Sequence, residues 1–425
     1  MDSRPDGGRV QQGEWPALFV SFAYFFCVLT AYYVIRPVRD QLSGAVGSTQ
    51  LPWFYGATFI ATLLLTPLFA GLVARYPRRI MVPVVYGFFI ACLIAFVPFF
   101  ASDGLISPRA LGVAFYVWVS VFNLFVVSVF WIFMSDVWDP GQARRLFPLI
   151  AFAGTAGALA GPLLTTSLVE VIGVAPLLVV SAVLLALATV CSIVLGRWAR
   201  DPAQPPHRAN DAPIGGGMLD GIRQIFASPF MRTMAILLLL ADGIGTVNYA
   251  LLADYSNATF TTAEARTVFA ARVDLFANVL TIVLQLGVTW WLLPRVGPGR
   301  LILIWAAIGM LSLGAVMLAR DPYAPVLAGL PIVAVAAFIS RGLAYGMAEP
   351  ARHSLFTQVP REERFKGQNA VDTAVWRFGD LVVALLMNAG RAAGVGIAGF
   401  AALGAGAAAV AAGLGWRLSR YRGRA

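Results

Sequence analysis

Long runs of apolar residues recur along the chain and are separated by short polar segments. Stretches such as VFNLFVVSVFWIF and LILIWAAIGMLSLGAVML, with their flanks, approach the roughly 20 residues that a helix needs to cross a bilayer. The pattern predicts twelve membrane-spanning helices. Their cores are residues 16–35, 52–74, 79–101, 110–133, 146–170, 174–196, 230–251, 268–292, 300–319, 324–346, 368–390 and 394–416.

The composition supports a membrane protein and argues against soluble domains. Hydrophobic residues make up 59% and charged residues 12% of the chain, whereas soluble domains have roughly 45–50% and about 25%. The net charge of +10 is spread over short loops between apolar runs, which is typical of a topology signal and excludes nucleic acid as the expected partner. The three cysteines lie in apolar runs and there are only two histidines. We therefore expect an all-α polytopic membrane protein with no metal site and no cofactor.

The arginines predict how the chain is oriented. Most of them fall in alternate loops, such as Arg78, Arg79, Arg144 and Arg145, and in the tail after residue 416. Positively charged loops face the cytoplasm. This places both termini in the cytoplasm and the chain in the cytoplasmic (inner) membrane, with the first helix retained instead of being removed as a signal peptide.

A Pro- and Gly-rich stretch in the middle of the sequence divides the spans into two groups of six. We expect an N-terminal half at 1–198, a cytoplasmic linker at 199–228 and a C-terminal half at 229–425. The halves echo each other, because DPGQARRLF at 139–147 parallels VPREERFKG at 359–367. Parallel six-helix repeats build the major facilitator superfamily, and GLVARYPRR at 71–79 resembles that superfamily's signature loop. The predicted fold is therefore major facilitator superfamily-like.

Polar residues at membrane depth are costly, so each is a candidate functional residue. In the eleventh span Lys366, Asn369, Thr373, Arg377 and Asp380 fall within an arc of roughly 100° at helical periodicity. Lipid cannot satisfy such a stripe, which predicts a water-filled cavity or polar partners. A purely structural Arg377–Asp380 ion pair is the alternative.

Two further spans carry polar faces. Four residues of the eighth span share one face: Asp274, Asn278, Thr281 and Gln285. Three residues of the tenth span do the same: Arg341, Tyr345 and Glu349. Because residues three or four apart are neighbours on a helix, each set is expected to line the same side of its helix.

The first and fourth spans end in charged residues. The first ends AYYVIRPVRD, where Arg36 and Asp40 have the spacing of an ion pair and Arg39 would be left for a ligand. The planar fork of arginine suits phosphate or carboxylate, although an interfacial cap is the alternative. The fourth span contributes Asn123 and, at its end, Asp136. These residues complete the predicted substrate-binding set.

Three segments resemble one transporter family. Arg36-Pro-Val-Arg-Asp40, Ser135-Asp-Val-Trp138 and Lys366-Gly-Gln-Asn-Ala-Val-Asp372 are similar to motifs of the ATP:ADP antiporter family, and most of all to its bacterial major facilitator-like relatives. The resemblance implies transport of a phosphorylated substrate, with roles for Arg39, Asp136 and Lys366. The chain departs from the lysine-rich nucleotide exchangers, because Lys366 is its only lysine.

These features predict a transporter and not an enzyme, because the chain has no phosphate loop, nucleophile elbow or zinc-protease motif. The first hypothesis is a secondary active transporter, an exchanger or symporter, of an organic anion such as a nucleotide or another phosphorylated metabolite. One alternative is proton-coupled transport of a cationic or amphipathic solute, as in drug export. Another is a non-transporting subunit of a membrane complex.

Overall fold

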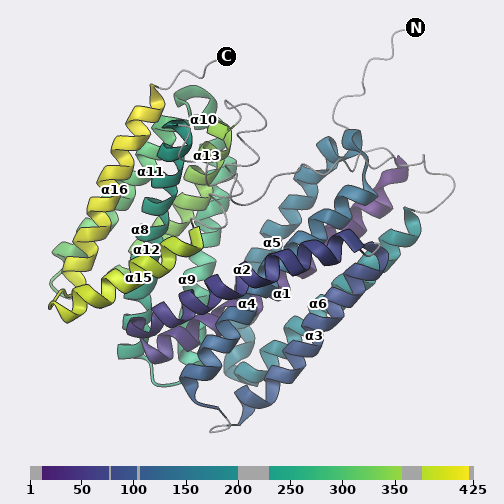
Figure 1. The fold of residues 1–425 in the computed structure, drawn as a ribbon, viewed down its shortest axis with the longest axis horizontal. Helices are drawn as coiled ribbons and strands as arrows, with labels where there is room; N and C mark the ends of the chain where they lie inside the picture. Colours follow the sequence, from purple (N-terminus) through teal and green to yellow (C-terminus); the bar gives the residue numbers. More distant parts are fainter. Residues whose placement is uncertain (1–11, 76–77, 103–105, 200–228, 357–375, 421–425) are drawn as a thin grey trace. The chain divides into compact units, whose positions relative to one another are not determined.

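The computed structural model describes residues 12–75, 78–102, 106–199, 229–356 and 376–420 (Figure 1). Almost all of these residues are helical. Among them, 11 helices are long and apolar enough to cross a membrane. A further helix, α15 (Trp376–Ala392), occupies the position predicted for the eleventh span.

The chain divides into two compact units, which are described separately. Unit 1 comprises Met1–Asp40, Ile60–Ala212 and Ala263–Ala271, and unit 2 comprises Gln41–Phe59, Pro213–Thr262 and Arg272–Ala425. Three of the boundaries between the units fall inside helices, after Asp40, Phe59 and Ala271. The segment that connects the first two helices therefore belongs to unit 2, although it lies in the N-terminal part of the sequence.

The first six long helices match the first six predicted spans. They are α1 (Trp15–Val46), α2 (Leu51–Arg75), α3 (Arg78–Ala101), α4 (Pro108–Val137), α5 (Pro140–Ile172) and α6 (Val174–Trp198). Two short 3-10 helices, η1 (Gln12–Glu14) and η2 (Ser48–Gln50), precede α1 and α2. Small residues let α5 approach α1 closely. A Cβ atom added to Gly157 would lie 2.7 Å from the carbonyl oxygen of Phe26, and one added to Gly161 would lie 2.4 Å from Cβ of Tyr33. This Gly-x-x-x-Gly spacing is a common contact between membrane helices.

The remaining helices match the last six predicted spans. They are α8 (Pro229–Thr259), α9 (Ala263–Val283), the π-helix η3 (Leu284–Thr289), α10 (Trp290–Val296), α11 (Pro298–Leu318), α12 (Ile332–Leu343), the π-helix η4 (Ala344–Ala348), α13 (Glu349–Phe356), α15 and α16 (Ile397–Ser419). Two short strands, β1 (Pro325–Leu327) and β2 (Leu330–Pro331), form an antiparallel hairpin before α12. The apolar core of unit 2 joins α8, α11, α12, α13 and α16.

Several predicted span boundaries differ from the helix ends; for example, the seventh span was expected to end at residue 251, but α8 continues to Thr259. The first span was expected to end at residue 35, but α1 continues to Val46 with Pro37 inside it. The tenth was expected to begin at residue 324, but the hairpin occupies that stretch and the helix starts at Ile332. The hairpin turns at Ala328 and Gly329, whose φ angles of 50° and 77° are incompatible with a right-handed helix.

Some predicted features lie outside the described residues. They include most of the linker at 199–228, and Lys366, Asn369 and Thr373 of the eleventh span. The predicted division into two halves therefore stays a prediction.

Candidate functional site

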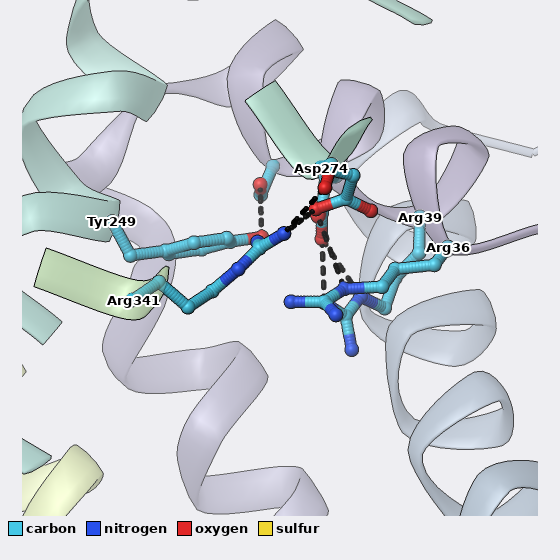
Figure 2. Close-up of polar contacts among 7 residues, drawn as sticks. Arg36, Arg39, Tyr249, Asp274 and Arg341 are labelled. Carbon is cyan, nitrogen blue, oxygen red and sulfur yellow. Dashed lines mark hydrogen bonds and ion pairs between the residues drawn. The ribbon is translucent and has the colours of Figure 1, made fainter. Parts of the chain in front are cut away.

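A group of charged side chains lies on α1, inside the helix and not at its end. Arg39 donates from Nε and Nη2 to Oδ1 of Asp40, at 2.8 and 2.7 Å. Nε of Arg36 lies 3.9 Å from the other carboxylate oxygen, and Figure 2 shows both guanidinium groups with their dashed contacts. The predicted Arg36–Asp40 pair exists, but the expectation that Arg39 would be left over is wrong. The adjacent arginine reaches the carboxylate more closely.

Aromatic rings hold these two guanidinium groups. Cζ of Arg39 lies 4.7 Å from the ring centroid of Tyr116 on α4, and Cζ of Arg36 lies 5.5 Å from that of Tyr33. Arg39 and Tyr116 are only 9% and 6% exposed. A cation stacked on an aromatic face away from water is attracted by about 2 kcal/mol. The group therefore holds positive charge in fixed positions inside unit 1.

The fourth helix brings Asn123 toward this group but not Asp136. Asn123 is half-buried and lies seven residues after Tyr116, on the same face of α4. Asp136 lies near the end of the helix, about 30 Å from Tyr116 along the axis at 1.5 Å per residue. The predicted set of site residues is therefore not a single cluster in unit 1.

A second charged pair is buried in unit 2. Nη2 of Arg341 on α12 lies 2.5 Å from Oδ1 of Asp274 on α9, and the Asp274 side chain is 1% exposed. Figure 2 shows the two side chains pointing at each other. Asn278 follows one turn later on α9 and is half-buried. The sequence placed these residues on separate polar stripes, and the structure pairs them across two helices.

The other residues predicted for this face of the tenth span do not lie on one face with Arg341. The π-helix η4 interrupts α12, and its wider turn shifts the register of everything that follows. Tyr345 is 45% exposed, and Glu349 forms ion pairs with Arg352 and His353 instead of continuing the Arg341 face. The expectation of one face assumed an uninterrupted α-helix and was wrong.

Asp380 on α15 faces α8. Its Oδ1 accepts a hydrogen bond from Oγ1 of Thr246 at 2.8 Å. A Cβ atom added to the preceding Gly379 would lie 2.8 Å from Oδ2 of Asp242. Asp242 therefore lies beside Gly379, the residue that precedes Asp380. The backbone of Arg377 lies in the first turn of the same helix, and its side chain lies outside the described part of the chain.

Sequence reasoning missed one polar cluster in unit 2. The connection between α1 and α2 is bonded to α8 and α15 through four hydrogen bonds: Ser43 Oγ with Tyr249 Oη, Ser48 N to Asp254, Asn257 to Ala45 O, and Asn388 to Thr49 O. Gly47 adopts φ 77° in this connection, a conformation that favours glycine. Figure 2 includes the Tyr249 contact. The only sequence signal was the small-residue run SGAVGST.

Comparisons with known proteins establish the fold. No family model matches the chain, and no curated protein matches its sequence. The structure of the nucleoside transporter NupG has a TM-score of 0.66 at 14% identity, over 97% of this chain and 100% of that chain. The chain has the fold of a membrane transporter.

Two other solved structures agree. A bacterial homologue of the iron transporter ferroportin, in an inward-facing state, has a TM-score of 0.65 at 14% identity over 97% of this chain and 100% of that chain. A D-xylose–proton symporter has 0.64 at 12% identity over 95% and 97%. The predicted all-α, polytopic, major facilitator-like fold is confirmed. The chain is a multi-pass integral membrane protein.

Proposed function

We propose that the chain is a secondary active transporter of an organic anion, working by alternating access of two six-helix halves. The observation that carries the proposal is the group of Arg36, Arg39 and Asp40 on α1. Two guanidinium groups are directed at one carboxylate inside a membrane helix, and aromatic rings hold them. Fixed guanidinium groups bind carboxylate or phosphate through paired, charge-assisted hydrogen bonds.

Nucleotides and other phosphorylated metabolites are the proposed substrates within this class. The support is the resemblance of Arg36–Asp40 and neighbouring motifs to the ATP:ADP antiporter family, together with the aromatic rings beside the arginines. Tyr33, which is partly exposed, offers a flat ring on which a nucleobase can stack. Arg39, Asp40 and Asn123 are proposed to contact the substrate from unit 1. Asp274, Asn278, Arg341 and Asp380 are proposed to do so from unit 2.

A counterflow assay tests the proposal. Purified protein in liposomes preloaded with an unlabelled compound is offered the same labelled compound, across a panel of nucleotides, sugar phosphates and dicarboxylates. We expect accumulation for at least one anion, and loss of at least tenfold in rate for Arg39→Gln. Arg197→Gln is the matched control because Arg197 is an exposed arginine at the end of α6. Absence of counterflow with every anion would refute the anionic substrate class.

One observation favours a second candidate, proton-coupled transport of a cationic or amphipathic solute. The Asp274 side chain is 1% exposed and pairs with Arg341, and Asp380 shares its region of unit 2 with Asp242. Buried carboxylates in membrane helices are common proton carriers. Uptake that depends on an imposed pH gradient and is lost in Asp274→Asn, with no anion counterflow, would favour this candidate over the first.

A further inference from the structure

The beginning of α11 and the end of α16 touch backbone to backbone. A Cβ atom added to Gly299 would lie 2.2 Å from the backbone nitrogen of Ser419, and one added to Gly415 would lie 2.8 Å from that of Leu303. Only glycine permits this approach. The two helices run side by side in Figure 1. Side chains flanking the contact are therefore held near one another at this end of unit 2.

Four exposed arginines flank this contact. They are Arg295, Arg300, Arg417 and Arg420. Arg300 directly follows Gly299, and Arg420 directly follows Ser419. The sequence has no aspartate or glutamate from 275 to 320 or from 381 to 425. The acid of α13, Glu349, is bound by Arg352 and His353. These four arginines form a basic patch, and the sequence segments that carry them contain no acidic residue to neutralise its charge.

Exposed tryptophans hold two of the four arginines. Cζ of Arg295 lies 4.2 Å from the ring centroid of Trp291, and Cζ of Arg420 lies 4.7 Å from that of Trp416. The rings are 50% and 48% exposed, and the neighbouring Trp290 is 76% exposed. Exposed tryptophan in a membrane protein is typical of the level of the lipid headgroups. The stacked pairs therefore mark the depth of the patch in the bilayer.

The other two arginines are available to bind a ligand. In the part of unit 2 that the structure describes, the guanidinium groups of Arg300 and Arg417 take part in no ion pair. A guanidinium group binds phosphate oxygens in a planar, two-bond geometry. Basic clusters at headgroup depth bind the headgroups of acidic lipids.

We propose that Arg300 and Arg417, flanked by the Trp291–Arg295 and Trp416–Arg420 stacks, form a binding site for the phosphate of an anionic phospholipid. Arg300 and Arg417 bind the phosphate, and the exposed indole rings contact the glycerol and upper acyl region. In the predicted orientation the site faces the cytoplasmic leaflet. The site shares no residue with the charged groups on α1, α9 and α12, and it does not depend on the identity of the transported substrate.

A lipid titration tests this proposal. Protein purified in an uncharged detergent is titrated with phosphatidylglycerol and, separately, with phosphatidylcholine, and binding is followed by native mass spectrometry and by the shift in melting temperature. We expect tighter binding of phosphatidylglycerol. Arg300→Gln/Arg417→Gln should weaken it by roughly thirtyfold, since each basic residue near an acidic lipid surface contributes a factor of about five.

Three comparisons keep the outcome interpretable. Arg272→Gln/Arg320→Gln removes the same charge from exposed arginines elsewhere in unit 2 and should leave lipid binding unchanged. Arg300→Lys/Arg417→Lys keeps the charge and should bind within about fivefold of the unchanged chain, which shows that the site still folds. Inorganic phosphate and glycerol 3-phosphate are titrated in parallel. Equal binding of both lipids, equal loss in both glutamine variants, or full stabilisation by free phosphate would overturn the proposal.

Discussion

Removing the charge of Arg391 tests the ion pair that fastens the α1–α2 connection within unit 2. Nη2 of Arg391 on α15 lies 2.8 Å from Oδ2 of Asp254 on α8, and the two side chains are 21% and 27% exposed. The other carboxylate oxygen of Asp254 accepts a hydrogen bond from the backbone nitrogen of Ser48. Arg391 also donates to Asn388, which itself bonds to the backbone of Thr49. The pair is therefore the centre of a network that holds the connection.

The expected cost follows from charge, distance and burial. Two unit charges about 4 Å apart attract by about 4 kcal/mol at an effective dielectric constant of about 20. Desolvation and lost side-chain freedom offset part of this attraction. Arg391→Gln leaves the mostly buried Asp254 without its cation, so we expect a loss of about 3 kcal/mol of unfolding free energy. Asp254→Asn should cost about 2 kcal/mol, and the double variant should show a coupling of about 2 kcal/mol.

Equilibrium unfolding in mixed micelles with increasing sodium dodecyl sulfate, followed by circular dichroism, measures these free energies. Arg320→Gln is the control, because Arg320 is exposed at the far end of α11; it should change stability by less than about 0.5 kcal/mol. If the effects of the two single variants add in the double variant, with a coupling below about 0.5 kcal/mol, water screens the Arg391–Asp254 pair. That result would refute the expectation that partial burial strengthens the pair.

Three further predictions concern packing and titration. Gly157→Val should cost more than about 3 kcal/mol of unfolding free energy, because the valine side chain would meet the α1 backbone. Gly87→Ala is the control and should be neutral or stabilising, because the added methyl group would meet open space. Thr289→Val should cost about 1 kcal/mol, measured in the same assay, through loss of its 2.6 Å hydrogen bond to Gly346 O. Burial and the Asp254 carboxylate raise the pKa of Tyr323, in the loop after α11, above its usual 10.0. The contribution of Tyr323 to the free energy of unfolding is therefore fully present below pH 10 and is lost as the pH rises above 10. Melting curves in a pH series should show this loss for the unchanged chain and not for Tyr323→Phe.

Hydrophobic patterning predicted the helices well, because a span of roughly 20 apolar residues has few alternatives in a bilayer. Patterning failed in α1, where charged side chains pair with one another inside the helix. The first span was ended before Arg36 because charges are expensive in lipid. Yet α1 continues through Arg39 and Asp40, which neutralise each other beside the Tyr116 ring. Averaging hydropathy over a window treats the charges of Arg36, Arg39 and Asp40 as exposed to lipid, so it places the end of the helix too early.

The candidate site was harder to predict, because it depends on which helices are neighbours. Helical phase alone grouped Arg341 with Glu349, while the structure pairs Arg341 with Asp274 and Glu349 with Arg352. The π-helices η3 and η4 cause part of this difference, since each shifts the phase of its helix. No residue type in LQLGVT or AYGMA marks such a shift in the sequence.

The polar stripe that runs from α9 into η3 shows why polar residues at membrane depth are not equivalent. Gln285 donates to the backbone oxygen of Tyr345, and Thr289 donates to that of Gly346. Both acceptors belong to η4, where the π-helix leaves the usual hydrogen bonds rearranged. These side chains therefore satisfy backbone oxygens, and their polarity is explained by the fold.

Asp274 on the same stripe is different, because its carboxylate forms an ion pair with the side chain of Arg341. A backbone oxygen fixes its donor permanently, but an ion pair can exchange one partner for a charged ligand at little cost, since the charge stays compensated. Among the proposed site residues that the structure describes, two groups are held by ion pairs: Arg36–Arg39–Asp40 and Asp274–Arg341. Thr289→Val should therefore change stability and leave ligand affinity unaltered. Arg341→Gln should change ligand affinity by more than its effect on stability accounts for.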